Sequence, residues 1–264
     1  MSHKKWFGEM FSKPYWNMVG ELAFSNFKQK DQGTFFGFLW TLINPLLYFL
    51  VLYTIFNKWM GSKVSDFPLY LIIGIVQWNF FSSATTNAIS AILSNASVIV
   101  SMDVEKSALV FSSVLSVLFS HIVELITLII VFVLIKGTIS LYWLWLIPLL
   151  VLNIYLVVSF SFILATVGVY FLDMSRIWGL AMSIGFFLTP IFYPMSVISQ
   201  DKRIIILCNP MTHIIYAARS ILIDRAMPAF GGLLYVVILS TILFVFGFAY
   251  FKKKEGYFVE KIYG

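Results

Sequence analysis

The sequence predicts an all-α integral membrane protein with six transmembrane helices, an N-terminal amphipathic interfacial helix, and a re-entrant helix pair between the fifth and sixth spans. Hydrophobic residues fill 60% of the 264 positions and charged residues only 11%, whereas charged residues make up about 25% of an ordinary soluble domain. Six apolar runs are long enough to cross a bilayer. One further segment is too apolar for a solvated loop and too interrupted for a span.

Residues 1–34 are predicted to form a cytoplasmic interfacial segment. Between residues 6 and 27, aromatic and aliphatic side chains stand among Lys13 and Glu21, and Pro14 interrupts the first part. A charged helix with one apolar face is suited to lying in the membrane interface rather than crossing it. A disordered tail is the alternative for this segment.

The transmembrane domain is predicted over residues 35–254, with a cytoplasmic tail at 255–264. The spans are expected at about 35–59, 68–93, 107–135, 141–171, 176–194 and 230–251. An even number of spans places both termini on one side. Eleven of the eighteen Lys and Arg residues fall on that side, which the positive-inside rule assigns to the cytoplasm. We therefore expect a multi-pass protein of a bacterial-type inner or plasma membrane.

Polar residues recur at three- and four-residue spacing in the second and third spans, which marks faces turned toward other helices or water. In the third span this stripe includes Glu124, and His121 lies one turn away. Such a pair can relay protons, but no second acidic residue at membrane depth continues a relay. We interpret His121 and Glu124 as a structural, hydrogen-bonded pair.

The re-entrant pair is predicted within the stretch from Trp178 to Asp224. A 17-residue uncharged run begins at Trp178 and ends at Pro194, near the lower length limit for crossing a bilayer. Six charged residues then alternate with apolar stretches over residues 195–228. Irregular backbone at membrane depth survives only where it is buried in protein or lines a cavity. This segment is therefore expected to border a pathway.

Two aromatic ladders are candidates for the lining of that pathway. Phe49, Tyr53 and Phe56 share one face of the first span, and Phe186 and Tyr193 share one face of the fifth. Sugar rings can stack on aromatic planes through their C–H faces without a fixed binding position, which suits a long, repetitive substrate. The alternative is that the ladders face lipid or pack between helices.

Motifs for covalent chemistry and nucleotide hydrolysis are absent from the sequence. There is no phosphate-binding glycine loop, HExxH, GxSxG or paired-carboxylate site. The single cysteine, Cys208, excludes an intramolecular disulfide and a multi-cysteine metal cluster. We expect no enzymatic activity, metal or cofactor in this chain itself. The net charge of +6 lies mainly at segment ends, where it suits anionic lipid headgroups rather than nucleic acid.

An ordered set of motifs gives the chain a family resemblance that extends over almost its whole length. The members of the set are Gly37-Phe38-Leu39-Trp40, Pro45-Leu46, Tyr70-Leu71, Gly74, Trp78-Asn79-Phe80-Phe81, Asn95, Asp173, Thr189-Pro190-Ile191, Tyr193-Pro194, Asn209-Pro210 and Arg219. In this order and spacing the chain resembles the membrane subunits of type-2 ABC exporters of O-antigen, capsule and teichoic-acid polysaccharides.

The resemblance implies a channel-forming permease that works as a homodimer with two copies of a separate ABC ATPase, and ATP and Mg belong to that ATPase. It also implies export of a lipid-linked polysaccharide from the cytoplasmic side, without specifying the glycan repeat or the lipid carrier. Relatives commonly carry a basic loop after the second span and an Arg before Asp173, where this chain has an acidic loop and Leu172. The residues expected to contact the ATPase are Asn95, Asp103, Glu105 and Lys106.

Two other functions remain open at this point. A type-2 ABC exporter of drugs or small lipids shares the six-span plan, and a proton-coupled secondary transporter would use Glu124 and His121. No matching pair of broken helices supports the inverted repeat that is common in secondary transporters. The aromatic ladders and the TPIFYP and NP motifs favour polysaccharide.

Overall fold

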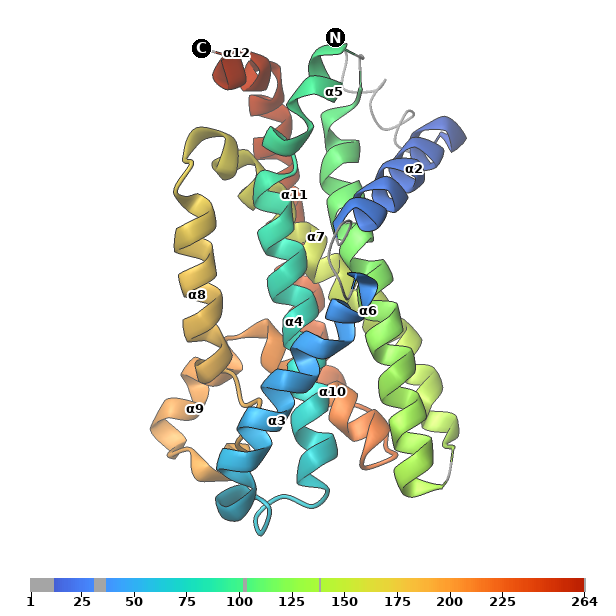
Figure 1. Cartoon of the computed structure of the whole chain (residues 1–264). Helices are drawn as coiled ribbons and strands as arrows, with labels where there is room; N and C mark the ends of the chain where they lie inside the picture. The colour runs from blue at the N-terminus through green and yellow to red at the C-terminus, as the bar shows by residue number, and fades with distance from the viewer. Residues whose placement is uncertain (1–11, 31–36, 102–103, 138, 264) are drawn as a thin grey trace.

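The computed structural model describes residues 12–30, 37–101, 104–137 and 139–263, and every regular element in these ranges is a helix (Figure 1). Five helical segments of this described part are long and apolar enough to cross a membrane. Their α-helices are α3 (Trp40–Met60), α4 (Phe67–Ser90), α6 (Lys106–Lys136), α7 (Leu146–Tyr170) and α11 (Phe230–Lys254). The all-α membrane fold class is therefore confirmed.

Shorter helices lie between and beside these five. The α-helices among them are α2 (Lys13–Lys30), α5 (Ala96–Ser101), α8 (Met174–Leu188), α9 (Gln200–Leu207), α10 (Pro210–Leu222) and α12 (Phe258–Tyr263). The single-turn 3-10 helices are η1 (Gly37–Leu39), η2 (Leu93–Asn95), η3 (Leu141–Trp145), η4 (Met195–Val197) and η5 (Glu255–Tyr257). Helices α2, α5 and α12 lie toward one end of the bundle, and α9 and α10 toward the other (Figure 1).

Helix α2 occupies the place of the predicted interfacial helix. It begins at Lys13, so Pro14 stands in the first turn, where a missing N–H breaks no helical hydrogen bond. Tyr15, Val19 and Ala23 follow at four-residue spacing and are all buried. They form the face of α2 that packs on α6.

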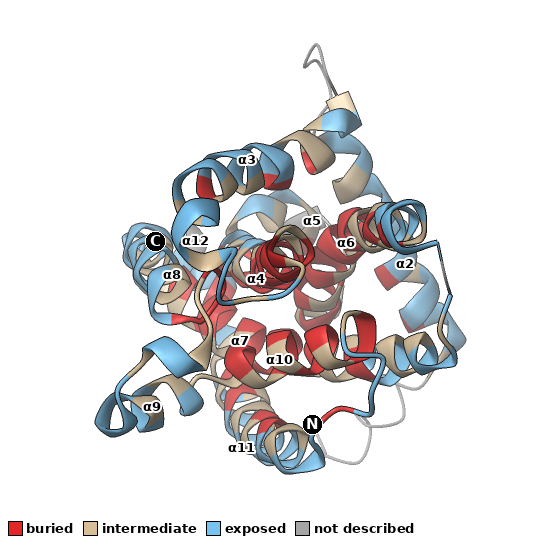
Figure 2. Cartoon of the chain, turned by 90° about the horizontal axis from the view of Figure 1, so that it is seen from below, coloured by how far each residue is buried: buried red, intermediate tan, exposed pale blue. Residues whose placement is uncertain are grey.

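Helix α4 is the centre of the bundle. It contacts α3, α6, α7, α8 and α10, and Figure 2 shows buried residues concentrated on α4, on α10 and on the facing sides of α6 and α7. Gly168 lets α7 approach closely, because a Cβ at this position would overlap the carbonyl oxygen of Ile89. A buried hydrogen bond of 2.8 Å from Asn153 Nδ2 to Gln77 Oε1 joins the same two helices.

Helix α8 is shorter than the span predicted at residues 176–194. It ends at Leu188 after 15 residues, fewer than the ~17–25 of a typical transmembrane helix. Thr189 adopts extended backbone with ψ 139°, as expected for a residue that precedes proline. Residues 189–192 are irregular yet buried, which is the condition for such backbone at membrane depth.

The predicted re-entrant pair is present as α9 and α10, which meet at an angle of 95°. Asn209 begins α10: its Oδ1 accepts a hydrogen bond of 3.0 Å from the Met211 N–H, and Pro210 occupies the first helical turn. The Asn209 Nδ2 donates to Thr189 Oγ1 at 2.7 Å. The asparagine therefore caps α10 and ties it to the end of α8.

Arg219 of α10 joins this re-entrant segment to the centre of the bundle. Its Nε and Nη2 donate to the Tyr70 carbonyl at 3.2 and 3.1 Å. Its Nη1 and Nη2 also donate to the carbonyls of Pro190 and Ile191 at 2.8 and 2.7 Å. Gly74 leaves the room, since a Cβ there would lie 2.8 Å from Arg219 Nη2. One buried guanidinium thus satisfies two carbonyls of the irregular backbone after α8 and ties this backbone to the Tyr70 carbonyl of α4.

We predict that Arg219→Lys lowers the stability of the protein. Lysine keeps the positive charge, so the loss would come from the missing hydrogen bonds. An ammonium cannot reproduce the planar fork, and each buried carbonyl left without a donor costs about 1–3 kcal/mol. The apparent melting temperature of the detergent-solubilised protein should fall by several degrees. Arg176→Lys, at an exposed position of α8, is the matched control, and equal melting temperatures for the two variants would contradict the role given to Arg219.

Candidate functional site

A cavity of ≈ 580 Å³ lies between α3, α4 and α8. Aromatic side chains dominate its walls, and a few small polar groups stand among them. The aromatic residues are Tyr48, Phe56, Trp78, Phe186 and Phe187, and the polar ones are Asn79, Ser82 and Ser183. This composition offers flat apolar surfaces with scattered hydrogen-bonding groups and contains no charged side chain.

One hydrogen bond and one close contact hold α8 against α4 at this cavity. Trp178 Nε1 donates to Thr85 Oγ1 at 2.9 Å, and Thr85 Oγ1 in turn donates to the Phe81 carbonyl at 2.7 Å. Gly185 admits the Trp78 ring, because a Cβ there would lie 2.8 Å from Trp78 Cη2. The cavity wall formed by α8 is therefore fixed at its start and near its end.

The structure brings only part of the two predicted ladders to this cavity. Phe56 and Phe186 line it, and Phe192 connects them, with ring centroids 4.6 and 6.4 Å from the two rings. Phe49 lines a different groove, and Tyr53 stacks between Phe49 and Phe67.

The inclination of α3 across α4 explains this separation (Figure 1). Helix α3 contacts both α4 and α6, so the face that carries the ladder adjoins α6 near Phe49 and α8 near Phe56. Tyr193 lies beyond the end of α8, where its hydroxyl donates to the carbonyls of Phe187 and Leu188 at 3.0 and 3.1 Å. Tyr193 therefore caps α8.

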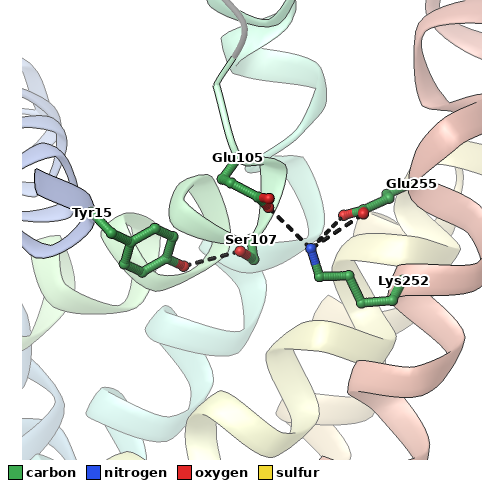
Figure 3. Close-up of polar contacts among 5 residues, drawn as sticks. All are labelled: Tyr15, Glu105, Ser107, Lys252 and Glu255. Carbon is green, nitrogen blue, oxygen red and sulfur yellow. Dashed lines mark hydrogen bonds and ion pairs between the residues drawn. The ribbon is translucent and has the colours of Figure 1, made fainter. Parts of the chain in front are cut away.

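A polar cluster ties together three chain segments at the opposite end of the bundle from α9 (Figure 3). Lys252 Nζ, near the end of α11, lies 3.0 Å from Glu105 Oε2 and 3.1 Å from Glu255 Oε2. Beside them, the Tyr15 hydroxyl of α2 and Ser107 Oγ of α6 share a hydrogen bond of 3.0 Å. Burial raises the pKa of Tyr15 to about 12, so this hydroxyl keeps its proton at neutral pH. The cluster fixes the start of α6 against both ends of the chain.

The residues predicted to contact an ATPase surround the short helix α5. Asn95 Nδ2 donates to the Ala91 carbonyl at 2.8 Å and so closes the end of α4. Glu105 is bound to Lys252, and Lys106 is the first residue of α6. Asp103 lies outside the described residues. Contact with an ATPase remains a prediction for these positions.

The predicted pair of His121 and Glu124 is in contact, although its hydrogen bond is long. His121 Nδ1 lies 3.5 Å from Glu124 Oε2, and the imidazole stacks on Phe80 with ring centroids 4.3 Å apart. Both residues line a small polar cavity between α3, α4 and α6. The structural role of the pair stays a prediction.

Arg219 and Lys252 stabilise the structure around these sites. The sequence marks both as basic residues but does not reveal their partners. Arg219 is an isolated basic residue in an apolar helix, which marks it as paired or functional, but its three carbonyl partners are distant in sequence. Lys252 stands in a run of three lysines, which the sequence presents as a topology signal. Its partner Glu105 is 147 positions away, and no spacing rule connects the two.

The fold and these sites belong to a membrane permease, and comparison with known proteins gives its family. The chain belongs to the ABC-2 type transporter family, which matches it over residues 20–223. It is 30% identical over 236 residues to the O-antigen export system permease protein RfbA of Klebsiella pneumoniae, covering 88% of this chain and 90% of that protein.

Two further relatives are more distant in sequence and equally extensive. The O-antigen export system permease protein RfbA of Myxococcus xanthus is 26% identical over 251 residues, with 94% of this chain and 96% of that protein covered. The polysialic acid transport protein KpsM of Escherichia coli is 22% identical over 227 residues, with 83% and 86% covered. The similarity therefore includes the re-entrant segment as well as the long helices.

Lys252→Gln is expected to loosen the polar cluster. The substitution removes the cation that Glu105 and Glu255 share, and leaves two nearby carboxylates that repel each other, at a cost of about 1–3 kcal/mol. Hydrogen exchange should rise in α12 and in the first turn of α6. Lys253→Gln removes the same charge from the exposed neighbouring residue. It should leave hydrogen exchange in α12 and in the first turn of α6 unchanged. Similar exchange in the two variants would show that the cluster does not hold these segments.

Proposed function

We propose that this chain is the channel-forming permease subunit of an ATP-driven exporter that moves lipid-linked polysaccharide from the cytoplasmic side across the inner or plasma membrane. The aromatic cavity between α3, α4 and α8 carries the proposal, because it offers stacking surfaces without a charged group. The relatives, which are O-antigen export permeases and a polysialic acid transport protein, support a polysaccharide as the substrate.

In this proposal the cavity is one half of a pathway that a second copy of the chain completes. Helix α8 has no buried residue and is too short to act as an ordinary span, which supports a partner against its outer face. Sugar rings would pass from one aromatic plane to the next. Permeation requires binding that is weak and repeated, and Phe56, Phe186 and Phe187 provide several similar surfaces rather than one strong site.

ATP hydrolysis would come from a separate ATPase subunit that docks at α5 and its flanks. Helix α5 lies at the end of the bundle that also carries α2 and α12 (Figure 1), and the Lys252–Lys254 run near this end supports a cytoplasmic location. Force applied at α5 would reach α6 through a connection of only a few residues. From there the bond between Glu105 and Lys252 leads to α11.

Phe56→Ala and Phe186→Ala should each reduce export severalfold, since each removes a stacking plane from the cavity. The measurement is the amount of surface polysaccharide in cells that rely on the variant, with the level of the protein in the membrane checked in parallel. Phe246→Ala removes the same ring from an exposed position of α11 and should export normally. If all three variants export alike, the cavity is not the pathway.

Docking of the ATPase is best tested at Ser97, an exposed residue of α5, because reversing Glu105 would also break the bond to Lys252. Ser97→Trp adds bulk at the proposed interface without adding charge, and should abolish co-purification of the ABC ATPase that is co-expressed with this permease. Ser199→Trp, at an exposed position near α9, serves as the control and should retain the ATPase. Full retention by Ser97→Trp would place the docking surface elsewhere.

A further inference from the structure

A small polar cavity lies along the same face of α3 as the aromatic cavity, nearer to the start of the helix. Its volume is ≈ 80 Å³, and its polar walls come from α3, α4 and α6. Thr41, Asn44, Ser120, His121 and Glu124 contribute to them. Pro45 also lines it, and proline lacks the N–H that would bond the Thr41 carbonyl in an unbroken helix. The Thr41 carbonyl therefore has no N–H donor from its own helix.

Three buried polar atoms in this cavity have no hydrogen-bond partner among the residues that the structure describes. They are Thr41 Oγ1, Ser120 Oγ and His121 Nε2, and the three residues are 8%, 4% and 1% exposed. Buried polar groups in proteins are nearly always bonded. The space is several times the roughly 10–15 Å³ that one water requires, so it can hold a larger polar group.

An apolar groove of ≈ 220 Å³ continues from the polar cavity along α3, α4 and α6. Pro45 and Glu124 line both spaces, and side chains such as Leu46, Phe49 and Leu128 line the groove alone. A polar pocket that opens into an apolar groove matches an amphiphile with one small headgroup and one hydrocarbon chain.

The position of the polar cavity matches the level of a lipid headgroup. Phe27 of α2 contacts Phe38 and Phe119, with ring centroids 5.4 and 5.7 Å apart. Phe119 immediately precedes Ser120 in α6, so the last turn of α2 lies at the level of the cavity along α6. A helix of this kind at the membrane interface is buried about 5–10 Å into the boundary between headgroups and acyl chains. A lipid headgroup can therefore reach the cavity from beneath α2.

The lining selects the kind of headgroup. No described Lys or Arg side chain lines either space, so a phosphate group would find no cation in the polar cavity, and the phosphodiester of a bound lipid has to remain outside it. The cavity instead presents the Glu124 carboxylate together with the two unpartnered hydroxyls and the unpartnered imidazole nitrogen. A primary ammonium brings a positive charge and three N–H donors to such a set.

We propose that the polar cavity and the groove form a binding site for an aminophospholipid of the membrane. The ammonium occupies the polar cavity against Glu124 and the unpartnered atoms, and one acyl chain lies in the groove. The lipid is a bound component of the permease rather than its cargo, because the site lacks the cations that a lipid diphosphate carrier needs. The site does not depend on the export function proposed above.

The test is native mass spectrometry of the purified, delipidated protein after addition of phosphatidylethanolamine, phosphatidylcholine or phosphatidylglycerol with identical acyl chains. Phosphatidylethanolamine should be retained about tenfold more strongly than either other lipid, as expected from one charge-assisted hydrogen bond. The choline headgroup keeps the charge but has no N–H donor, and so separates hydrogen bonding from charge alone.

Glu124→Gln should abolish this preference, whereas Glu260→Gln, at an exposed position in α12, should preserve it. Ser120→Ala provides a milder change of the same cavity should Glu124→Gln fold poorly, and it should weaken retention of phosphatidylethanolamine alone. Leu46→Trp fills the groove from an exposed position and should reduce retention of all three lipids. Equal retention of the three lipids by the unaltered protein, or no retention at all, would overturn the proposal and leave the cavity to water.

Discussion

The guanidinium of Arg219 is the constraint on which the rest of the structure depends. It binds the carbonyls of Tyr70, Pro190 and Ile191 and so joins the central helix to the irregular backbone after α8. Without those bonds, irregular backbone at this depth would leave acceptors with no donor. Because they are made, α8 can end at Leu188, and the chain can turn back through α9 and α10. The same arrangement sets the position of the α8 wall of the aromatic cavity.

Sequence reasoning succeeded where composition and local chemistry decide the outcome. Apolar length located the five long helices, and the Asn209-Pro210 pair marks a helix start whose cap the structure shows. It did not give the length of α8, because hydropathy does not distinguish apolar residues in a helix from apolar residues in irregular backbone. Helical spacing grouped Phe49 with Phe56 correctly on one helix face. The inclination of α3, which sends the two rings to different cavities, is a tertiary property that spacing does not contain.

Helix α3 lines both cavities with one of its faces and has little buried surface of its own. Only Thr41, Pro45 and Leu52 of this helix are buried, and α3 packs chiefly on α4. Asn79 of α4 lines both the aromatic and the polar cavity, so the two spaces adjoin behind α3. A group that fills the polar cavity can therefore change the shape of the aromatic cavity. A lipid chain in the groove would support α3 from the side that no helix of this chain fully covers.

The bonds described above also limit how the aromatic cavity can open. Helix α8 is bound to α4 through Trp178 and Thr85, and its far end is held through Asn209 and Thr189. The cluster around Lys252 joins α6 to α11, and α11 packs along α7. Within one copy of the chain, α3 can move without breaking these contacts, and its proline at position 45 gives a point of bending. Helix α3 adjoins both the aromatic cavity and the apolar groove, so bending it would change the shape of both.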